Sequence, residues 1–369
     1  MAPQDRYTIE PFGGGFEFGA RIYGMDLNNF SDEDIKFLRE NIQRYLIVIV
    51  KGQHKETPYK NWELLTKLDP GYKEYTDEQW SKIYHPEGLG IGARLGLRMI
   101  PGAGRLYLMG KGYQGKDHFG LEDVTIEEAF ANQYYSKPLP EEDFQSGVTR
   151  FQSWHMDGPQ YKQTVDWADG SGLQKKIRPG LTGFFSTAQL YNMFTEEEKK
   201  MADHSWCEQM YYPYEWILAC RGNPNGLNVK CEGRERPNEV MEAMPRDPED
   251  QLRLPLVWMN PTTGAKHFQV QPNTVRKLFI RNGPDEKPRI IDNVEEIREF
   301  LNKLMSRVLR PENIYVGPDE EGDHTLWFNW GLMHTKIDYP VEYGVRTAHQ
   351  GWIPAASFPQ GPVPIPVNN

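Results

Sequence analysis

Cysteine is scarce in this sequence: Cys207, Cys220 and Cys231 are the only three among 369 residues. No two of them form a C-x-x-C pair, which argues against a zinc ribbon, and three irregularly spaced cysteines do not make a disulfide framework. We therefore expect a protein of a reducing compartment, whose stability depends on an apolar core.

Long hydrophobic runs and an excess of basic residues are also missing. The longest apolar run, Leu46–Val50, is far shorter than the roughly 20 residues that cross a bilayer, and Met1–Arg6 shows no secretory pattern. The net charge of −10 argues against nucleic acid or an anionic membrane as the main partner. We expect a cytoplasmic protein that binds a small molecule. The sequence does not decide between a monomer and a homo-oligomer.

The apolar content is sufficient for a large core, because 38% of the residues are hydrophobic and 12% are aromatic. Many short alternating segments predict strands, and a few amphipathic segments predict helices that cover them. There is no internal repeat and no linker. We expect one domain over 1–369, mainly β with flanking helices, as in an antiparallel sandwich or jelly roll, with insertions near 54–145 and 206–253 that shape the pocket.

Local patterns place the individual elements. Helices are predicted behind capping residues at Ser31, Thr195 and Asn293. Polar residues predict a loop over 160–179, and a mixture of proline, glycine, tyrosine and charge predicts a long surface excursion, a candidate lid, over 206–253. Strands are expected over 7–25, Leu46–Val50, Arg105–Met109, Leu181–Thr187, Leu256–Asn260, Lys266–Val270, Thr325–Trp330 and Gly344–Ile353.

A histidine and an aspartate stand two residues apart in Trp154-His155-Met156-Asp157. On an extended backbone their side chains point to the same side. An imidazole and a carboxylate that converge supply two of the three ligands of the 2-His-1-carboxylate triad, which is typical of non-haem Fe(II) oxygenases. An isolated H-x-D also occurs by chance, so the hypothesis needs a third ligand.

His334 is the candidate for that ligand among the nine histidines. It lies shortly after the predicted strand Thr325–Trp330, and Arg346 follows on another extended run. In a jelly roll such a histidine can reach the H-x-D segment, and the guanidinium can hold a carboxylate through two charge-assisted hydrogen bonds. The residues alone leave simpler interpretations open, namely a strand-end histidine and a surface ion pair.

Further motifs along most of the chain resemble those of the taurine dioxygenase-like branch of the Fe(II)/2-oxoglutarate-dependent oxygenases. Each motif is moderately specific, whereas their order and spacing together are strongly so. The motifs are Phe18–Leu27, Trp154–Asp157, Gly180–Thr182 followed by Tyr191, Asn260–Gly264, Arg310–Glu312 and Gly322–Asn329, with His334 behind them.

This resemblance implies a double-stranded β-helix core with Fe(II) held by His155, Asp157 and His334. Arg346 would pair with the distal carboxylate of 2-oxoglutarate, assisted by Thr182, and O2 would be the second co-substrate. The implied reaction oxidises a C–H bond of a small molecule by hydroxylation, desaturation or ring closure, with release of succinate and CO2. Related halogenases lack a carboxylate at the position of Asp157, so halogenation is not expected.

Departures from the family pattern concern the substrate. Sulfonate-oxidising members carry a second arginine four residues after the co-substrate arginine, where this chain has Gln350. A neutral amide does not replace that charge-assisted contact, so a sulfonate substrate is not expected. Phe328 and Trp330 stand where the family has an aspartate and an arginine, which makes that wall more apolar.

The chain also resembles, more loosely, the fungal xanthine dioxygenases, which share a glutamine at the position of Gln350. The positions of the amide residues that are associated with purine recognition in those enzymes are occupied here by Arg105, Tyr107 and Trp352. This difference implies a different ligand, or a planar heterocycle held by stacking. The candidate substrate residues are Arg105, Tyr107, Lys116, Gln350 and Trp352. Tyr107 and Trp352 also fit a core, and Lys116 also fits a solvated loop.

The leading interpretation is thus an Fe(II)/2-oxoglutarate oxygenase of a small molecule. A purine hydroxylase of the same family, a non-catalytic jelly-roll binding protein and a metal-dependent hydrolase without co-substrate are the alternatives. No motif identifies the compound that is oxidised.

Overall fold

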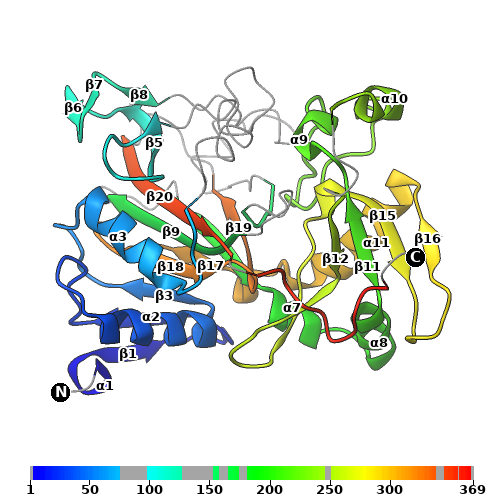
Figure 1. The fold of residues 1–369 in the computed structure, drawn as a ribbon, viewed down its shortest axis with the longest axis horizontal. Helices are drawn as coiled ribbons and strands as arrows, with labels where there is room; N and C mark the ends of the chain where they lie inside the picture. The colour runs from blue at the N-terminus through cyan, green and yellow to red at the C-terminus, as the bar shows by residue number, and fades with distance from the viewer. Residues whose placement is uncertain are drawn as a thin grey trace.

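The computed structural model describes residues 3–74, 98–126, 153–157, 165–173, 181–245, 251–337, 345–355 and 357–366 (Figure 1). Gly180 and Gly344, which begin two segments named above, lie outside these residues.

The largest sheet joins strands from both ends of the chain. Its neighbours are antiparallel except for β2 and β3, which are parallel. β8 (Thr125–Ile126) pairs with β5 at one side. The main path is β1 (Thr8–Pro11), β2 (Ala20–Tyr23), β3 (Ile47–Val50), β18 (His324–Phe328), β9 (Val165–Leu173), β20 (Arg346–Pro354), β5 (Tyr107–Tyr113) and β4 (Arg98–Met99).

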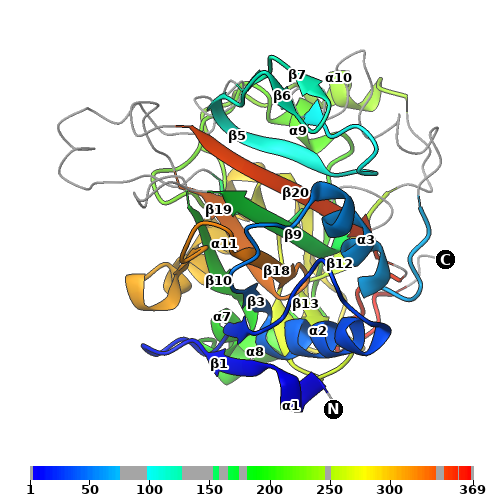
Figure 2. The ribbon, with the colours of Figure 1, turned by 90° about the vertical axis from the view of Figure 1, so that its left-hand side faces the viewer.

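A smaller sheet faces the middle of the large one. β10 (Thr182–Ser186) pairs antiparallel with both β17 (Tyr315–Gly317) and β19 (Leu332–Lys336). In Figure 2, β10 and β19 lie beside β18 and β9. Aromatic rings join the sheets: the Trp327 ring of β18 lies 5.5 Å from that of Phe184 and 5.3 Å from that of His334. Two facing antiparallel sheets confirm the predicted jelly-roll core.

Helices and small sheets surround this core. α2 (Asp32–Tyr45) packs on β3 and β18, and α3 (Pro58–Leu68) packs on β9 and β20. No helix in the described ranges is long and apolar enough to cross a membrane. The other elements are α1 (Pro3–Arg6), β6 (Asp117–His118), β7 (Leu121–Glu122), α7 (Thr187–Asn192), α8 (Glu196–His204), β11 (Trp206–Gln209), α9 (Pro213–Trp216), α10 (Asn238–Glu242), β12 (Arg253–Pro255), β13 (Val257–Met259), β14 (Lys266–Phe268), β15 (Val275–Ile280), β16 (Arg289–Ile291) and α11 (Val294–Met305).

The three predicted helix starts are confirmed, since each capping side chain accepts a backbone hydrogen bond from the third helical residue. Ser31 caps α2, Thr195 caps α8 and Asn293 caps α11. The predicted strands Leu256–Asn260 and Lys266–Val270 are present as β13 and β14, an antiparallel pair joined around Pro261–Gly264.

The prediction of a loop over 160–179 is wrong in the part that the structure describes, because β9 occupies Val165–Leu173. The sequence of β9 is rich in glycine and aspartate, which disfavour strands, and lacks alternation. Nevertheless β9 pairs with β18 on one side and with β20 on the other. Pairing on both edges, rather than intrinsic propensity, makes it a strand.

The segment 206–253 is more than the surface excursion that its composition predicts. It contains β11, α9, α10 and the start of β12, and it has a buried cluster of its own, formed by Met210, Trp216, Ile217, Cys220, Val229 and Met241. It also touches the H-x-D segment: the backbone N–H of Trp154 donates to the carbonyl of Gly226 at 2.9 Å, and its indole N–H donates to that of Asn225 at 3.1 Å. The segment therefore supports the candidate site.

The pair of Glu198 and Arg307 joins α8 to the end of α11 and gives a test of this arrangement. Arg307 donates from two nitrogens to the two carboxylate oxygens, each at 2.6 Å, which lowers the pKa of Glu198 to about 2. A lowered pKa stabilises the fold above the ordinary value of 4.5, and this stabilisation is lost as the pH falls towards 2.

We expect Glu198→Gln to lower the free energy of unfolding by about 1–2 kcal/mol at pH 7, a value reduced for partial exposure. The difference from wild type should shrink as the pH falls from 4.5 towards 2, because the wild-type carboxylate is protonated first in the unfolded state and only near pH 2 in the folded one. Urea unfolding at several pH values measures this. A difference that does not depend on pH would show that the ion pair contributes nothing.

Candidate metal centre

His155, Asp157 and His334 meet between the two sheets. The segment 153–157 runs antiparallel beside β19, because the N–H of His155 donates to the carbonyl of His334 at 2.9 Å and the reverse bond is 2.8 Å long. The carboxylate oxygens of Asp157 lie 3.9 Å from Nε2 of His155 and 3.6 Å from Nε2 of His334. One ligand atom from each residue lies within 4.8 Å of the others.

A backbone carbonyl fixes the tautomer of His155. Its Nδ1 lies 2.8 Å from the carbonyl oxygen of Ser153, which can only accept a hydrogen bond. The proton on Nδ1 is therefore engaged by this carbonyl, and Nε2 is the ring nitrogen that faces Asp157. This orientation is the one that a metal-binding histidine requires.

Burial favours the uncharged forms of the other two ligands. Desolvation raises the pKa of Asp157, and it lowers the pKa of His334 well below its usual value. A neutral imidazole is a ligand, and a divalent cation would supply the positive charge that a buried carboxylate lacks. Two imidazole nitrogens and one carboxylate that lie close together fit the facial triad of non-haem Fe(II).

Asn329 holds the backbone of Asp157 from the end of β18. Its side-chain oxygen accepts the N–H of Asp157 at 3.2 Å, and its side-chain nitrogen donates to the carbonyl of Asp157 at 2.8 Å. Asn329 is buried, with 1% of its surface exposed. The sequence contained it only as part of a motif and did not indicate this role.

Two buried glutamines support the same segment, and no sequence signal pointed to them. Gln271 accepts the N–H of Met156 at 3.3 Å. Gln269 donates to Met156 Sδ at 3.2 Å, and to the carbonyls of Asn329 and Leu332 beside the segment at 3.0 Å each. Both follow β14 in the chain, so the backbone of the H-x-D motif depends on a distant hairpin.

A cavity of about 50 Å³ is lined by one of the three candidate ligands, His334, and by the predicted co-substrate residues Thr182 and Arg346. It lies between the sheets, with Thr182 of β10 on one side and Arg346 and Gln350 of β20 on the other. Its lining in the described chain is Met109, Thr182, Phe184, Gly317, Pro318, Thr325, Trp327, His334, Arg346, Ala348 and Gln350. An arginine beside the candidate metal ligand His334 in a small cavity suits a carboxylate ligand.

The two faces of β20 serve different neighbours. Arg346, Ala348 and Gln350 alternate along one face, towards the cavity. His349 points to the other face, where its Nε2 lies 2.8 Å from Nε2 of His118. Burial lowers the pKa of His349 to about 4, so the side chain is neutral at pH 7. His349 and Gln350 therefore face opposite sides of β20.

The five candidate substrate residues do not all converge. Gln350 lines the cavity and donates to Asp157 Oδ2 at 3.4 Å. Tyr107 is buried directly across from Gln350 on β5. Trp352 is half-buried and packs against the core, Arg105 lies 3.9 Å from Glu74 Oε1, and Lys116 is exposed. Only Gln350 is among the described residues that line the cavity.

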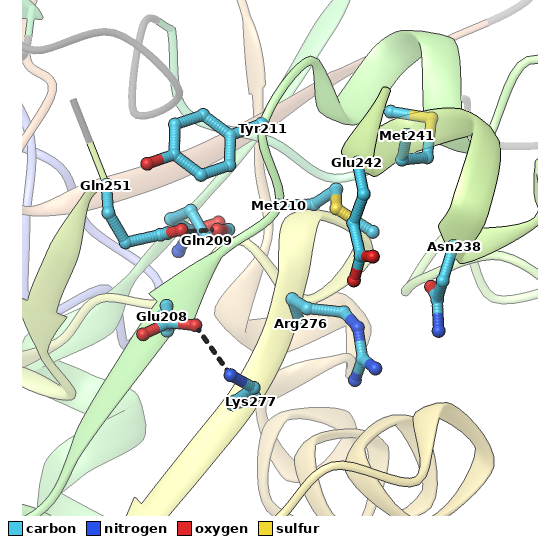
Figure 3. Close-up of a pocket in the computed structure, with 10 residues that line it drawn as sticks. All are labelled: Glu208, Gln209, Met210, Tyr211, Asn238, Met241, Glu242, Gln251, Arg276 and Lys277. Carbon is cyan, nitrogen blue, oxygen red and sulfur yellow. Dashed lines mark hydrogen bonds and ion pairs between the residues drawn. The ribbon is translucent and has the colours of Figure 1, made fainter. Parts of the chain in front are cut away.

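A larger hollow of about 260 Å³ lies apart from these residues, between β11, β15 and α10 (Figure 3). Of its two acidic residues, Glu208 is paired with Lys277 at 3.2 Å and with Arg253 at 3.0 Å. The lining residues are Glu208, Gln209, Met210, Tyr211, Asn238, Met241, Glu242, Gln251, Arg276 and Lys277. It contains none of the candidate ligands, so size alone does not locate the chemistry.

Comparison with known proteins agrees with this geometry. Residues 104–352 match the model of the family described as taurine catabolism dioxygenase TauD, TfdA family. The α-ketoglutarate-dependent dioxygenase fc-dox of Phomopsis amygdali is 60% identical, over 98% of this chain and 95% of its own. The dioxygenase bsc9 of Alternaria brassicicola, also α-ketoglutarate-dependent, is 55% identical over 94% and 93%.

More distant proteins share the same architecture. The α-ketoglutarate-dependent xanthine dioxygenase xanA of Emericella nidulans is 30% identical, over 92% of this chain and 93% of its own. The crystal structure of a putative α-ketoglutarate-dependent taurine dioxygenase from Burkholderia xenovorans superposes with a TM-score of 0.58 at 14% identity, covering 96% and 92% of the two chains, which shows a common fold. The chain therefore belongs to the TauD, TfdA family and is an α-ketoglutarate-dependent dioxygenase, an oxidoreductase with the family's jelly-roll fold.

Proposed function

We propose that His155, Asp157 and His334 hold Fe(II), and that the adjoining cavity takes 2-oxoglutarate, the same compound as α-ketoglutarate. The observation that carries the proposal is the convergence of three ligand atoms within 4.8 Å beside a cavity that contains Arg346. When bound, Fe(II) with O2 and 2-oxoglutarate supplies the oxidising power for a C–H oxidation that releases succinate and CO2.

The side chains divide this work. Arg346 pairs with the distal carboxylate of the co-substrate, because its guanidinium offers parallel N–H donors. Thr182, on the opposite wall, adds a hydroxyl. The hydrogen bond of His155 to Ser153 keeps one ligand in the binding tautomer, and Asn329 fixes the backbone of Asp157.

The substrate is a small molecule other than a sulfonate. Gln350 stands near the metal ligands, where sulfonate-oxidising members carry a cation, and it already donates to Asp157. The names of the two relatives that are 60% and 55% identical do not mention a purine. The xanthine dioxygenase is 30% identical, so we do not extend the proposal to purines. The three cysteines are free thiols, which supports a cytoplasmic location.

The first test removes one metal ligand. His155→Ala should reduce succinate release, measured with added Fe(II), O2 and 2-oxoglutarate, by at least about 100-fold, because losing a ligand costs more than the 10–100-fold typical of an outer partner. His204→Ala is the matched control, since His204 lies at the exposed end of α8. Unchanged turnover in His155→Ala would contradict the assignment. A parallel screen with purines, amino acids and sulfonates tests the substrate class, and taurine as the best substrate would overturn the interpretation of Gln350.

The second test concerns the co-substrate cation. Arg346→Gln should raise the Kd for 2-oxoglutarate by about 100-fold, because a charge pair in a desolvated site is lost. Arg346→Lys keeps the charge but lacks the paired donors, so it should raise the Kd for 2-oxoglutarate by an intermediate amount, about 10-fold. Anaerobic calorimetry on Fe(II)-loaded protein measures both values. Equal affinity in all three proteins would place the carboxylate elsewhere.

The third test addresses the amide that holds Asp157. Asn329→Ala should weaken Fe(II) binding by about 10–100-fold, because the ligand's backbone is no longer fixed. Asn238→Ala, on the exposed surface of α10, is the control and should bind Fe(II) as wild type does. Anaerobic Fe(II) titration followed by calorimetry distinguishes the two. If Asn329→Ala binds Fe(II) with the wild-type affinity, Asn329 does not contribute to the metal site.

A further inference from the structure

Some of the polar atoms around the co-substrate cavity have no hydrogen-bond partner. Oγ1 of Thr325 and Nε1 of Trp327 are both buried, and neither has an acceptor among the residues that the structure describes. Each residue is 3% exposed, and both line the cavity together with Arg346 and Thr182. Buried donors of this kind are normally satisfied, so unpaired ones at the wall of a cavity point to a ligand.

The strand register places Thr325 opposite the residues of β20. Gly170 of β9 pairs with Thr325 of β18 on one side and with Gln350 of β20 on the other. Two residues further along β9, Gly172 pairs with Ala348 of β20. Residues in register point to the same face, so Thr325 and Gln350 face the cavity from β18 and β20, on either side of β9. Two strand spacings separate Thr325 from Gln350, roughly 10 Å.

The chemistry of the walls selects an anion. Arg346 carries a positive charge, and Thr325, Trp327 and Thr182 can each donate a hydrogen bond. No aspartate or glutamate is among the described residues that line the cavity. A ligand with several acceptor oxygens, such as a carboxylate, matches this set of donors.

We propose that Thr325 is a further co-substrate-binding residue, whose hydroxyl donates to the distal carboxylate of 2-oxoglutarate together with Arg346 and Thr182. The inference rests on the proposed function, because it assumes 2-oxoglutarate in this cavity. Trp327 is less suited to a test, since its ring packs on both Phe184 and His334 and its removal would damage the core.

The proposal predicts different effects of a substitution at Thr325 on the stability of the free protein and on its affinity for 2-oxoglutarate. Without ligand, the buried hydroxyl of Thr325 lacks a partner, so an isosteric valine should leave the melting temperature of the free protein unchanged or raised. With ligand, the valine lacks a donor to a charged group, so Thr325→Val should raise the Kd for 2-oxoglutarate by about 10-fold. Thr325→Ser restores the hydroxyl and should return the affinity to within about 3-fold of wild type.

The experiment is anaerobic calorimetry of Fe(II)-loaded wild type and variants with 2-oxoglutarate, beside thermal melts of the same proteins without ligand. Thr347→Val is the matched control: Thr347 lies on the other face of β20, where its hydroxyl donates to Gln114 at 2.6 Å. It should lower the melting temperature and leave the Kd unchanged.

The outcomes are distinct. A Kd that rises in Thr325→Val and recovers in Thr325→Ser, without loss of stability, supports the proposal. A Kd that is unchanged in Thr325→Val, or that rises equally in the serine variant, overturns it. If wild type itself binds no 2-oxoglutarate, the proposed function fails first, independently of Thr325.

Discussion

Two backbone hydrogen bonds between His155 and His334 hold the candidate metal centre together. They join a short segment that precedes β9 to a strand from the last tenth of the chain. Because the bonds are reciprocal, they fix the spacing and the facing of both imidazoles at once. Asn329 and the two glutamines then secure the residues between and beside these ligands. The convergence of three ligands therefore depends on backbone pairing as much as on side-chain chemistry.

The cavity beside this bridge has the opposite electrostatic character from the protein as a whole. The chain carries a net charge of −10, yet the cavity is lined in its described part by one arginine and by neutral donors. The sheet arrangement explains this separation, because Thr182 and Arg346 come from facing sheets and meet only in the fold. An anion finds a complementary environment there and little attraction on the outer surface.

The sequence indicated the candidate ligands, which the structure brings together, better than it indicated the residues that position them. His155, Asp157 and Arg346 stand in short motifs, so their type and spacing could be interpreted directly. The starts of capped helices such as α11 could also be predicted, because the capping residue directly precedes the helix. Asn329 and Gln269 act on backbone amides that lie far away in the chain, which no local pattern encodes. β9 was missed for a related reason: its strand conformation is imposed by two neighbours that are distant in sequence.

The contacts between Trp154 and the segment 206–253 have a consequence for engineering. The carbonyls of Asn225 and Gly226 accept hydrogen bonds from Trp154, which directly precedes His155. The positions of the histidine and the aspartate in the H-x-D motif therefore depend on this segment. Exchanging the whole segment between relatives, as a route to new substrate selectivity, would also shift the ligands. A graft that keeps 223–228 native and varies only the flanking parts would preserve the anchor while remodelling the rest.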